Sequence, residues 1–105
     1  MNPIAWLILV LAAVFEVAGD AAIRRGLRGP SKVWVLVGCA MLALYGVIVN
    51  TVKWDFSKML GVYVGFFALA GVLFGKLAFG ETISSATWCG LALIILGGAI
   101  MQLGR

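Results

Sequence analysis

Hydrophobic residues fill four long stretches of this chain, and short polar segments separate them. The pattern predicts helices over residues 4–23, 33–52, 59–79 and 86–103. Each stretch is close to the roughly 20 apolar residues that a helix needs to cross a bilayer. Lipid offers the backbone no water, and these runs lack the strand alternation of membrane barrels. We therefore expect an all-α, polytopic membrane protein made of one four-helix transmembrane domain, residues 1–105.

The composition agrees with this expectation, because 64% of the 105 residues are hydrophobic and only 11% are charged. Soluble domains contain about 45–50% apolar residues. Met1, Asn2 and Pro3 carry no basic side chain, so the first stretch is expected to remain as a permanent helix rather than to act as a signal peptide. Tryptophans near predicted helix ends are expected to lie at the membrane interface, namely Trp6, Trp34, Trp54 and Trp88.

The formal charge of +4 comes from basic residues that cluster at the ends of the predicted helices. This placement favours contact with lipid headgroups over binding to nucleic acid. The first and third connectors with Lys76 hold five Lys and Arg residues, and the second connector with the C-terminus holds three. So small a bias allows the chain to insert in both orientations, and it allows an antiparallel homodimer.

Glu16 is the central candidate for function, because it interrupts the apolar stretch LAAVFEVAGD in the middle of the first predicted helix. A charged side chain near the bilayer centre costs about 2.5–3.5 kcal/mol on insertion scales. Loss of water favours the neutral carboxyl group until a cation stabilises its charged form. A proton and a cation would then compete for one site, which is the physical basis of exchange. The alternative is a structural Glu16, paired with Lys76 or hydrogen-bonded to a neighbouring helix.

Charged residues near Glu16 form a possible secondary site. Asp20 and Arg24 follow Glu16 at intervals of four residues, so the three share one helical face. Asp20 is expected either to pair with Arg24 or to help protons and substrate to enter. Lys76 is expected to extend its ammonium group to the interface beside Glu81, whereas an inward Lys76 would argue against a cationic substrate.

Aromatic residues of the third predicted helix are candidates for a ligand-binding wall. Organic cations are attracted to aromatic faces by about 0.5–2 kcal/mol each. Tyr63 is the strongest candidate, because its hydroxyl group could also bond Glu16, and Phe66 and Tyr45 are secondary candidates. Aromatics at helical spacing also serve as packing residues, and this alternative stays open.

Glycines are spaced for close approach of helices in lipid. The pairs are Gly61 with Gly65, Gly71 with Gly75, and Gly90 with Gly97. Helix packing, a hinge and a dimer seam are all compatible with this spacing. Cys39 and Cys89 are expected to be small buried hydrophobes. The sequence contains no histidine and shows neither a metal-ligand cluster nor a nucleophile beside a base, so we expect no metal, no cofactor and no enzyme.

Taken together, these features resemble the small multidrug resistance family of the drug/metabolite transporter superfamily. The resemblance rests on the chain length, four helices, a glutamate midway along the first helix within FEVAGDAAIRRGLRG, and the GE turn at Gly80 and Glu81. It implies that Glu16 binds substrate and protons in turn, and that Tyr63 matches an aromatic of the third helix. It also implies an antiparallel dimer whose main seam is the last helix, with contacts at Gly90 and Gly97.

Two shorter resemblances concern related groups. GVYV is similar to a set of small inner-membrane proteins, and TWCGLALIILGG is similar to the last helix of flippase subunits for lipid-linked aminosugars. The leading expectation is a proton-coupled antiporter in a bacterial-type cytoplasmic (inner) membrane. As a homodimer, it would export small or hydrophobic organic cations of the guanidinium or quaternary ammonium type. The alternatives are a flippase for a lipid-linked metabolite and a non-transporting membrane subunit.

Overall fold

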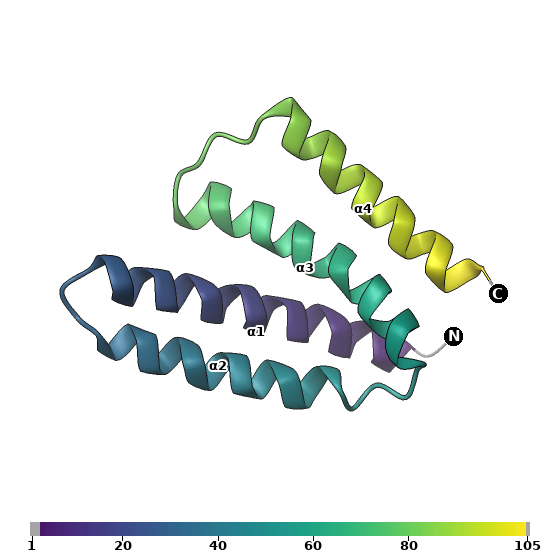
Figure 1. Ribbon diagram of the computed structural model, residues 1–105, viewed down its shortest axis with the longest axis horizontal. Coiled ribbons are helices and arrows are strands. Elements are labelled where there is room, and N and C mark those ends of the chain that lie inside the picture. Colours follow the sequence, from purple (N-terminus) through teal and green to yellow (C-terminus); the bar gives the residue numbers. More distant parts are fainter. Residues whose placement is uncertain (1–2, 105) are drawn as a thin grey trace. The chain divides into compact units, whose positions relative to one another are not determined.

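A computed structural model describes residues 3–104, and α-helices account for most of this range (Figure 1). The helices are α1 (Pro3–Arg28), α2 (Val33–Val49), α3 (Phe56–Ala78) and α4 (Ser85–Leu103). The described residues contain no strand, so the all-α expectation is confirmed. The chain divides into two compact units, one ending at Val52 and the other beginning at Lys53, and each unit is a pair of helices.

The helices have the length and composition of membrane spans. α1, α3 and α4 are each long and apolar enough to cross a bilayer, and α2 is a shorter apolar helix of 17 residues. A helix of about 17 residues lies at the lower limit for spanning the hydrocarbon core. The chain is therefore a four-helix membrane protein.

α1 continues to Arg28, beyond the predicted end at Ile23. Arginine and leucine favour helix, and the helix-breaking pair Gly29 and Pro30 comes only after Arg28. The ammonium group of Lys32 donates to the Gly26 carbonyl at 3.2 Å and so satisfies one acceptor of the last turns. With 26 residues, α1 is about 39 Å long, which exceeds the hydrocarbon core of about 30 Å. Its basic end therefore reaches the headgroup region.

α2 ends at Val49, three residues before the predicted end at Val52. Two polar side chains bind backbone carbonyls at this point. The amide of Asn50 donates to the Gly46 carbonyl at 2.7 Å, and the hydroxyl of Thr51 donates to the Ile48 carbonyl at 2.7 Å. Side-chain bonds of this kind offer the backbone an alternative to further helix.

Glycines bring the backbones of α1 and α2 into contact within the first unit, where the two helices run side by side (Figure 1). A Cβ atom on Gly19 would lie 3.0 Å from the carbonyl oxygen of Gly38. A Cβ atom on Gly38 would lie 2.9 Å from the backbone nitrogen of Ile23. Gly26 approaches Val35 in the same way, at 2.7 Å from its backbone nitrogen. Only glycine allows this approach, which maximises van der Waals contact in lipid.

α3 and α4 pack in the second unit through a similar set of small residues. A Cβ atom on Gly98 would lie 3.2 Å from the carbonyl oxygen of Gly61, and one on Gly65 would lie 3.7 Å from the Cα atom of Ile95. Gly61 also lies against the thioether of Met101. The pair Gly61 and Gly65 therefore serves helix packing.

The connection between α3 and α4 is closed by local hydrogen bonds. Gly80 takes the left-handed conformation with φ of 66°, and the N–H of Glu81 donates to the Gly75 carbonyl at 3.0 Å. Ser84 then caps α4, because its hydroxyl oxygen accepts from the N–H of Thr87 at 3.1 Å. The predicted GE turn at Gly80 and Glu81 thus lies between the end of α3 and the N-cap of α4.

Both cysteines are exposed on the surface of their helices, which corrects the expectation that Cys39 and Cys89 are buried. α2 and α4 are apolar on all sides, so the sequence does not show which side packs against a partner helix.

Candidate functional site

Glu16 lies at the midpoint of α1, with thirteen helical residues before it and twelve after it. Its side chain is half-buried. A rise of about 1.5 Å per residue places it about 20 Å from the start of the helix. In a bilayer that α1 spans, this position is close to the centre of the hydrocarbon core.

The neighbours of Glu16 along its own helix are small. Residues three and four positions away on a helix share its face, and for Glu16 these are Ala12, Ala13, Gly19 and Asp20. Ala12 and Ala13 are 0% and 2% exposed, and Gly19 is in contact with α2. None of these four neighbours has a large side chain that covers the carboxyl group of Glu16. The contact between Gly19 and α2 holds α1 in place one helical turn from Glu16.

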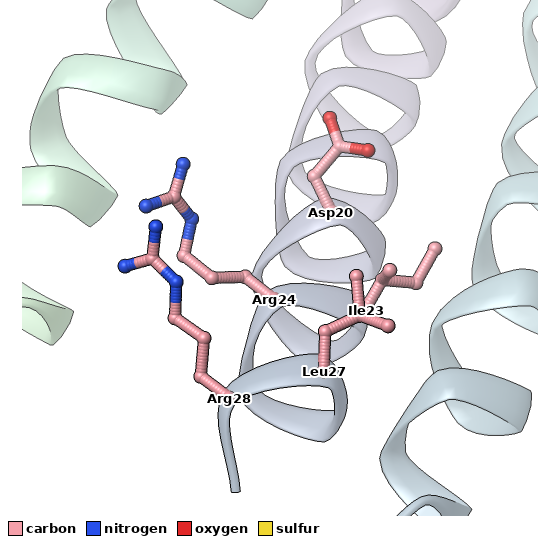
Figure 2. Close-up of a pocket in the computed structure, with 5 residues that line it drawn as sticks. All are labelled: Asp20, Ile23, Arg24, Leu27 and Arg28. Atoms are coloured by element: carbon pink, nitrogen blue, oxygen red, sulfur yellow. The ribbon is translucent and has the colours of Figure 1, made fainter.

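Asp20 belongs to an open pocket of about 400 Å³ at the end of α1 (Figure 2). The pocket is lined by Asp20, Ile23, Arg24, Leu27 and Arg28. The predicted common face therefore brings Asp20 and Arg24 to one pocket, and an ion pair between them stays a prediction. Arg28 extends the series by one more turn, because α1 does not end at Ile23. In the sequence, the spacing of four residues between Arg24 and Arg28 already indicated that the two share one face of a helix.

Arg25 takes a different direction from its neighbours. Its guanidinium carbon lies 4.9 Å from the centre of the Trp34 ring, in the geometry of a cation–π contact. Trp34 is the second residue of α2. The contact joins the two helices at their basic end, where an interfacial tryptophan was expected.

Tyr63 is 3% exposed on α3, and its ring stacks on Phe67 with 6.3 Å between centroids and 22° between planes. The stacked partner is Phe67 rather than Phe66, because residues four apart lie above one another on a helix. Phe66 and Tyr45 are half-buried. Glu16 and Tyr63 belong to different units, so a bond between them stays a proposal.

Lys76 is exposed in the last turn of α3. The loop beyond it folds back, because the carboxylate of Glu81 lies close above Gly75. A pocket of about 390 Å³ near Lys76 is lined by apolar side chains of the same helix, Leu73, Phe74, Leu77 and Ala78.

Gly90 and Gly97 lie on an open side of α4. A Cβ atom at either glycine would meet nothing within 4 Å, whereas Gly98 contacts α3. Large apolar residues of α4 are also exposed, among them Leu93 at 69% and Leu96 at 56%. This side is available to lipid or to a second chain. The packing role of Gly98 and the contact between Gly19 and Gly38 were not predicted from the sequence.

Four apolar helices with a carboxyl group at the middle of the first define a small polytopic membrane protein. Residues 4–94 match the family described as Small Multidrug Resistance protein, and the chain belongs to this family. Its members are transporters rather than enzymes, and they typically form dimers. The predicted family is thereby confirmed.

Bacterial relatives share almost the whole chain. A UPF0060 membrane protein of Frankia casuarinae is 35% identical over 94% of this chain and 92% of its own. UPF0060 membrane proteins of Mycolicibacterium gilvum and Desulfitobacterium hafniense are 32% and 27% identical, and the matches cover 91% and 90% of each chain. No solved structure is significantly similar to the chain.

Proposed function

We propose that the protein is a proton-coupled antiporter that exports organic cations, and that protons and substrate compete for Glu16. The observation that carries this proposal is the half-buried carboxyl group at the midpoint of α1, flanked by Ala12, Ala13 and Gly19. A carboxyl group at this depth is costly unless its charge is neutralised. A proton or a cation neutralises it, and one carboxyl group does not hold both.

Exclusive binding couples the two fluxes. When only a loaded Glu16 site reorients across the membrane, each inward movement of a proton permits an outward movement of substrate. The active form in this proposal is an antiparallel homodimer whose two Glu16 carboxyl groups share one chamber. The small difference in basic residues between the two sides of the chain supports insertion in both orientations.

The substrate class follows from the groups available to a ligand. A carboxylate selects a cation, and the half-buried Phe67, stacked on Tyr63, offers an aromatic face that attracts an organic cation by about 0.5–2 kcal/mol. Guanidinium and quaternary ammonium compounds carry this chemistry. Tyr63 is the proposed contact of the second unit with substrate, and Asp20 is the proposed entry point for protons.

The exposed Lys76 supports a second candidate, a flippase for an amphipathic lipid-linked metabolite. In the sequence, Lys76 lies between residues that line an apolar pocket of α3. Its ammonium group would attract an anionic headgroup, and the apolar side chains would contact the lipid chains. Under this alternative, reconstituted protein flips a labelled lipid and Glu16→Gln does so equally well.

Proton release tests the proposed exchange directly. Purified protein in weak buffer is expected to release protons when guanidinium or a bulky quaternary ammonium compound is added, because the cation displaces the proton from Glu16. The Glu16→Gln variant is the control and is expected to release none. The cation that triggers proton release identifies the substrate class. If the wild-type protein releases no protons with either cation, the exchange mechanism is excluded.

A dimer seam at Gly90 and Gly97 gives a separate expectation. Replacing both glycines with leucine is expected to shift the protein from dimer to monomer in detergent, because the new side chains fill the open side of α4. The measurement is the molar mass by light scattering. Gly46→Leu is the control, since a Cβ atom there also meets nothing within 4 Å. An unchanged proportion of dimer in the double variant would remove α4 as the seam.

A further inference from the structure

The basic end of α1 has a feature that the exchange mechanism does not use. We infer that Arg24 and Arg28 form a binding site for the phosphate group of an anionic phospholipid. Both arginines line the open pocket at this end of α1 (Figure 2). Figure 2 shows their side chains extending from the same side of the helix, with one guanidinium group above the other.

Two like charges one helical turn apart repel each other, and a shared anion removes this repulsion. Guanidinium is the side-chain group best suited to this task, because its planar fork binds phosphate oxygens in pairs. Asp20 is the third charged group of the pocket and lies one turn closer to the membrane centre. The pocket therefore carries a net charge of +1, which balances the single negative charge of a phosphodiester.

The depth of the two arginines matches that of lipid phosphates. Arg24 and Arg28 follow Glu16 by eight and twelve residues, which corresponds to about 12 and 18 Å along the helix. The boundary of the hydrocarbon core lies about 15 Å from the bilayer centre, so the backbone positions of the two arginines lie on either side of it. Asp20 lies within the core and would repel a phosphate that moved deeper.

Apolar residues of the pocket favour a lipid over a soluble phosphate. Ile23 and Leu27 complete the lining, and the side chain of Leu27 is 65% exposed. These side chains offer a surface for the glycerol and the first carbons of the acyl chains. A basic pocket with an apolar wall at the membrane surface is suited to an anionic lipid headgroup.

Native mass spectrometry of the purified protein tests this inference. The probes are phosphatidylglycerol, which is anionic, and phosphatidylcholine, which is zwitterionic. Wild-type protein is expected to retain phosphatidylglycerol in preference to phosphatidylcholine. Arg24→Gln and Arg28→Gln are each expected to weaken retention about tenfold, because each removes charge-assisted hydrogen bonds to the phosphate.

Arg25→Gln is the matched control, since it removes the same charge from the same turn while its guanidinium group faces Trp34. It is expected to retain the lipid within about twofold of wild type, because its side chain does not line the pocket. Circular dichroism establishes that all variants are helical. Equal loss in all three variants would reduce the effect to general charge attraction, and no loss in Arg24→Gln and Arg28→Gln would overturn the site. Displacement of the lipid by millimolar inorganic phosphate would show a phosphate site without preference for lipid.

Discussion

The Glu16→Gln variant is expected to fold and to dimerise but to lose exchange of protons for organic cations. Glutamine keeps the volume and the hydrogen bonding of the side chain and removes its titratable charge. Neither a proton nor a cation then has a carboxylate to neutralise, so the two fluxes lose their common site. The measurement is transport of guanidinium or a quaternary ammonium compound by proteoliposomes under an imposed pH gradient, and transport is expected to fall to the level of protein-free liposomes.

Asp20→Asn is the matched control for this variant, since it removes the same charge one helical turn away on the same face of α1. Asp20 is exposed, and its proposed role is limited to entry, so its variant is expected to keep coupled transport at a reduced rate. Transport by Glu16→Gln against a cation gradient and driven by protons would refute the role proposed for Glu16. Complete loss of coupling in Asp20→Asn alone would move that role to Asp20.

The Gly38→Leu variant is expected to disrupt the packing of α1 on α2. A Cβ atom at this position already overlaps the carbonyl oxygen of Gly19 and lies 2.9 Å from the backbone nitrogen of Ile23. Backbone atoms cannot rotate away as a side chain does, so the two helices must separate. Overpacking of this kind costs about 1–3 kcal/mol or more. Unfolding of the purified protein in mixed micelles, followed by circular dichroism as denaturing detergent increases, measures the loss.

Gly46→Leu provides the comparison on the same helix, since a Cβ atom there meets nothing within 4 Å. The same substitution at this position is expected to cause no loss of stability and to raise the free energy of unfolding by up to about 1 kcal/mol, because leucine favours helix more than glycine. An equal loss in the two variants would refute the contact with Gly19 as the cause, because leucine favours helix more than glycine and cannot lower stability through helix propensity.

The position of Glu16 could be predicted from the sequence because the apolar run around it is long. A run of this length fixes a membrane helix, and the middle of the run fixes the depth of the carboxyl group. The end of α1 was predicted too early, since Arg24 and Arg25 appeared to mark a connector. Arginine is a good helix former, and the helix continues until Gly29 and Pro30 stop it.

Contacts between helices were less accessible to sequence reasoning. The seam of the first unit joins Gly19 of α1 to Gly38 of α2, and a search for glycine pairs within one helix does not find it. On α4 the choice between Gly97 and Gly98 depends on the rotation of a helix that is apolar on all sides. Hydrophobic periodicity carries no information about that rotation, because lipid and protein neighbours are equally apolar.

Adjacent residues on a helix point about 100° apart, and this gives Gly97 and Gly98 separate tasks. Gly98 holds α4 against α3, and Gly97 leaves an open side. With the seam at Gly97, tertiary and quaternary structure depend on different residues of one helix. If Gly90 and Gly97 form the proposed dimer seam, a duplicated copy of the gene can change its pairing from self to non-self through substitutions at these two positions, while its own helix pair stays intact.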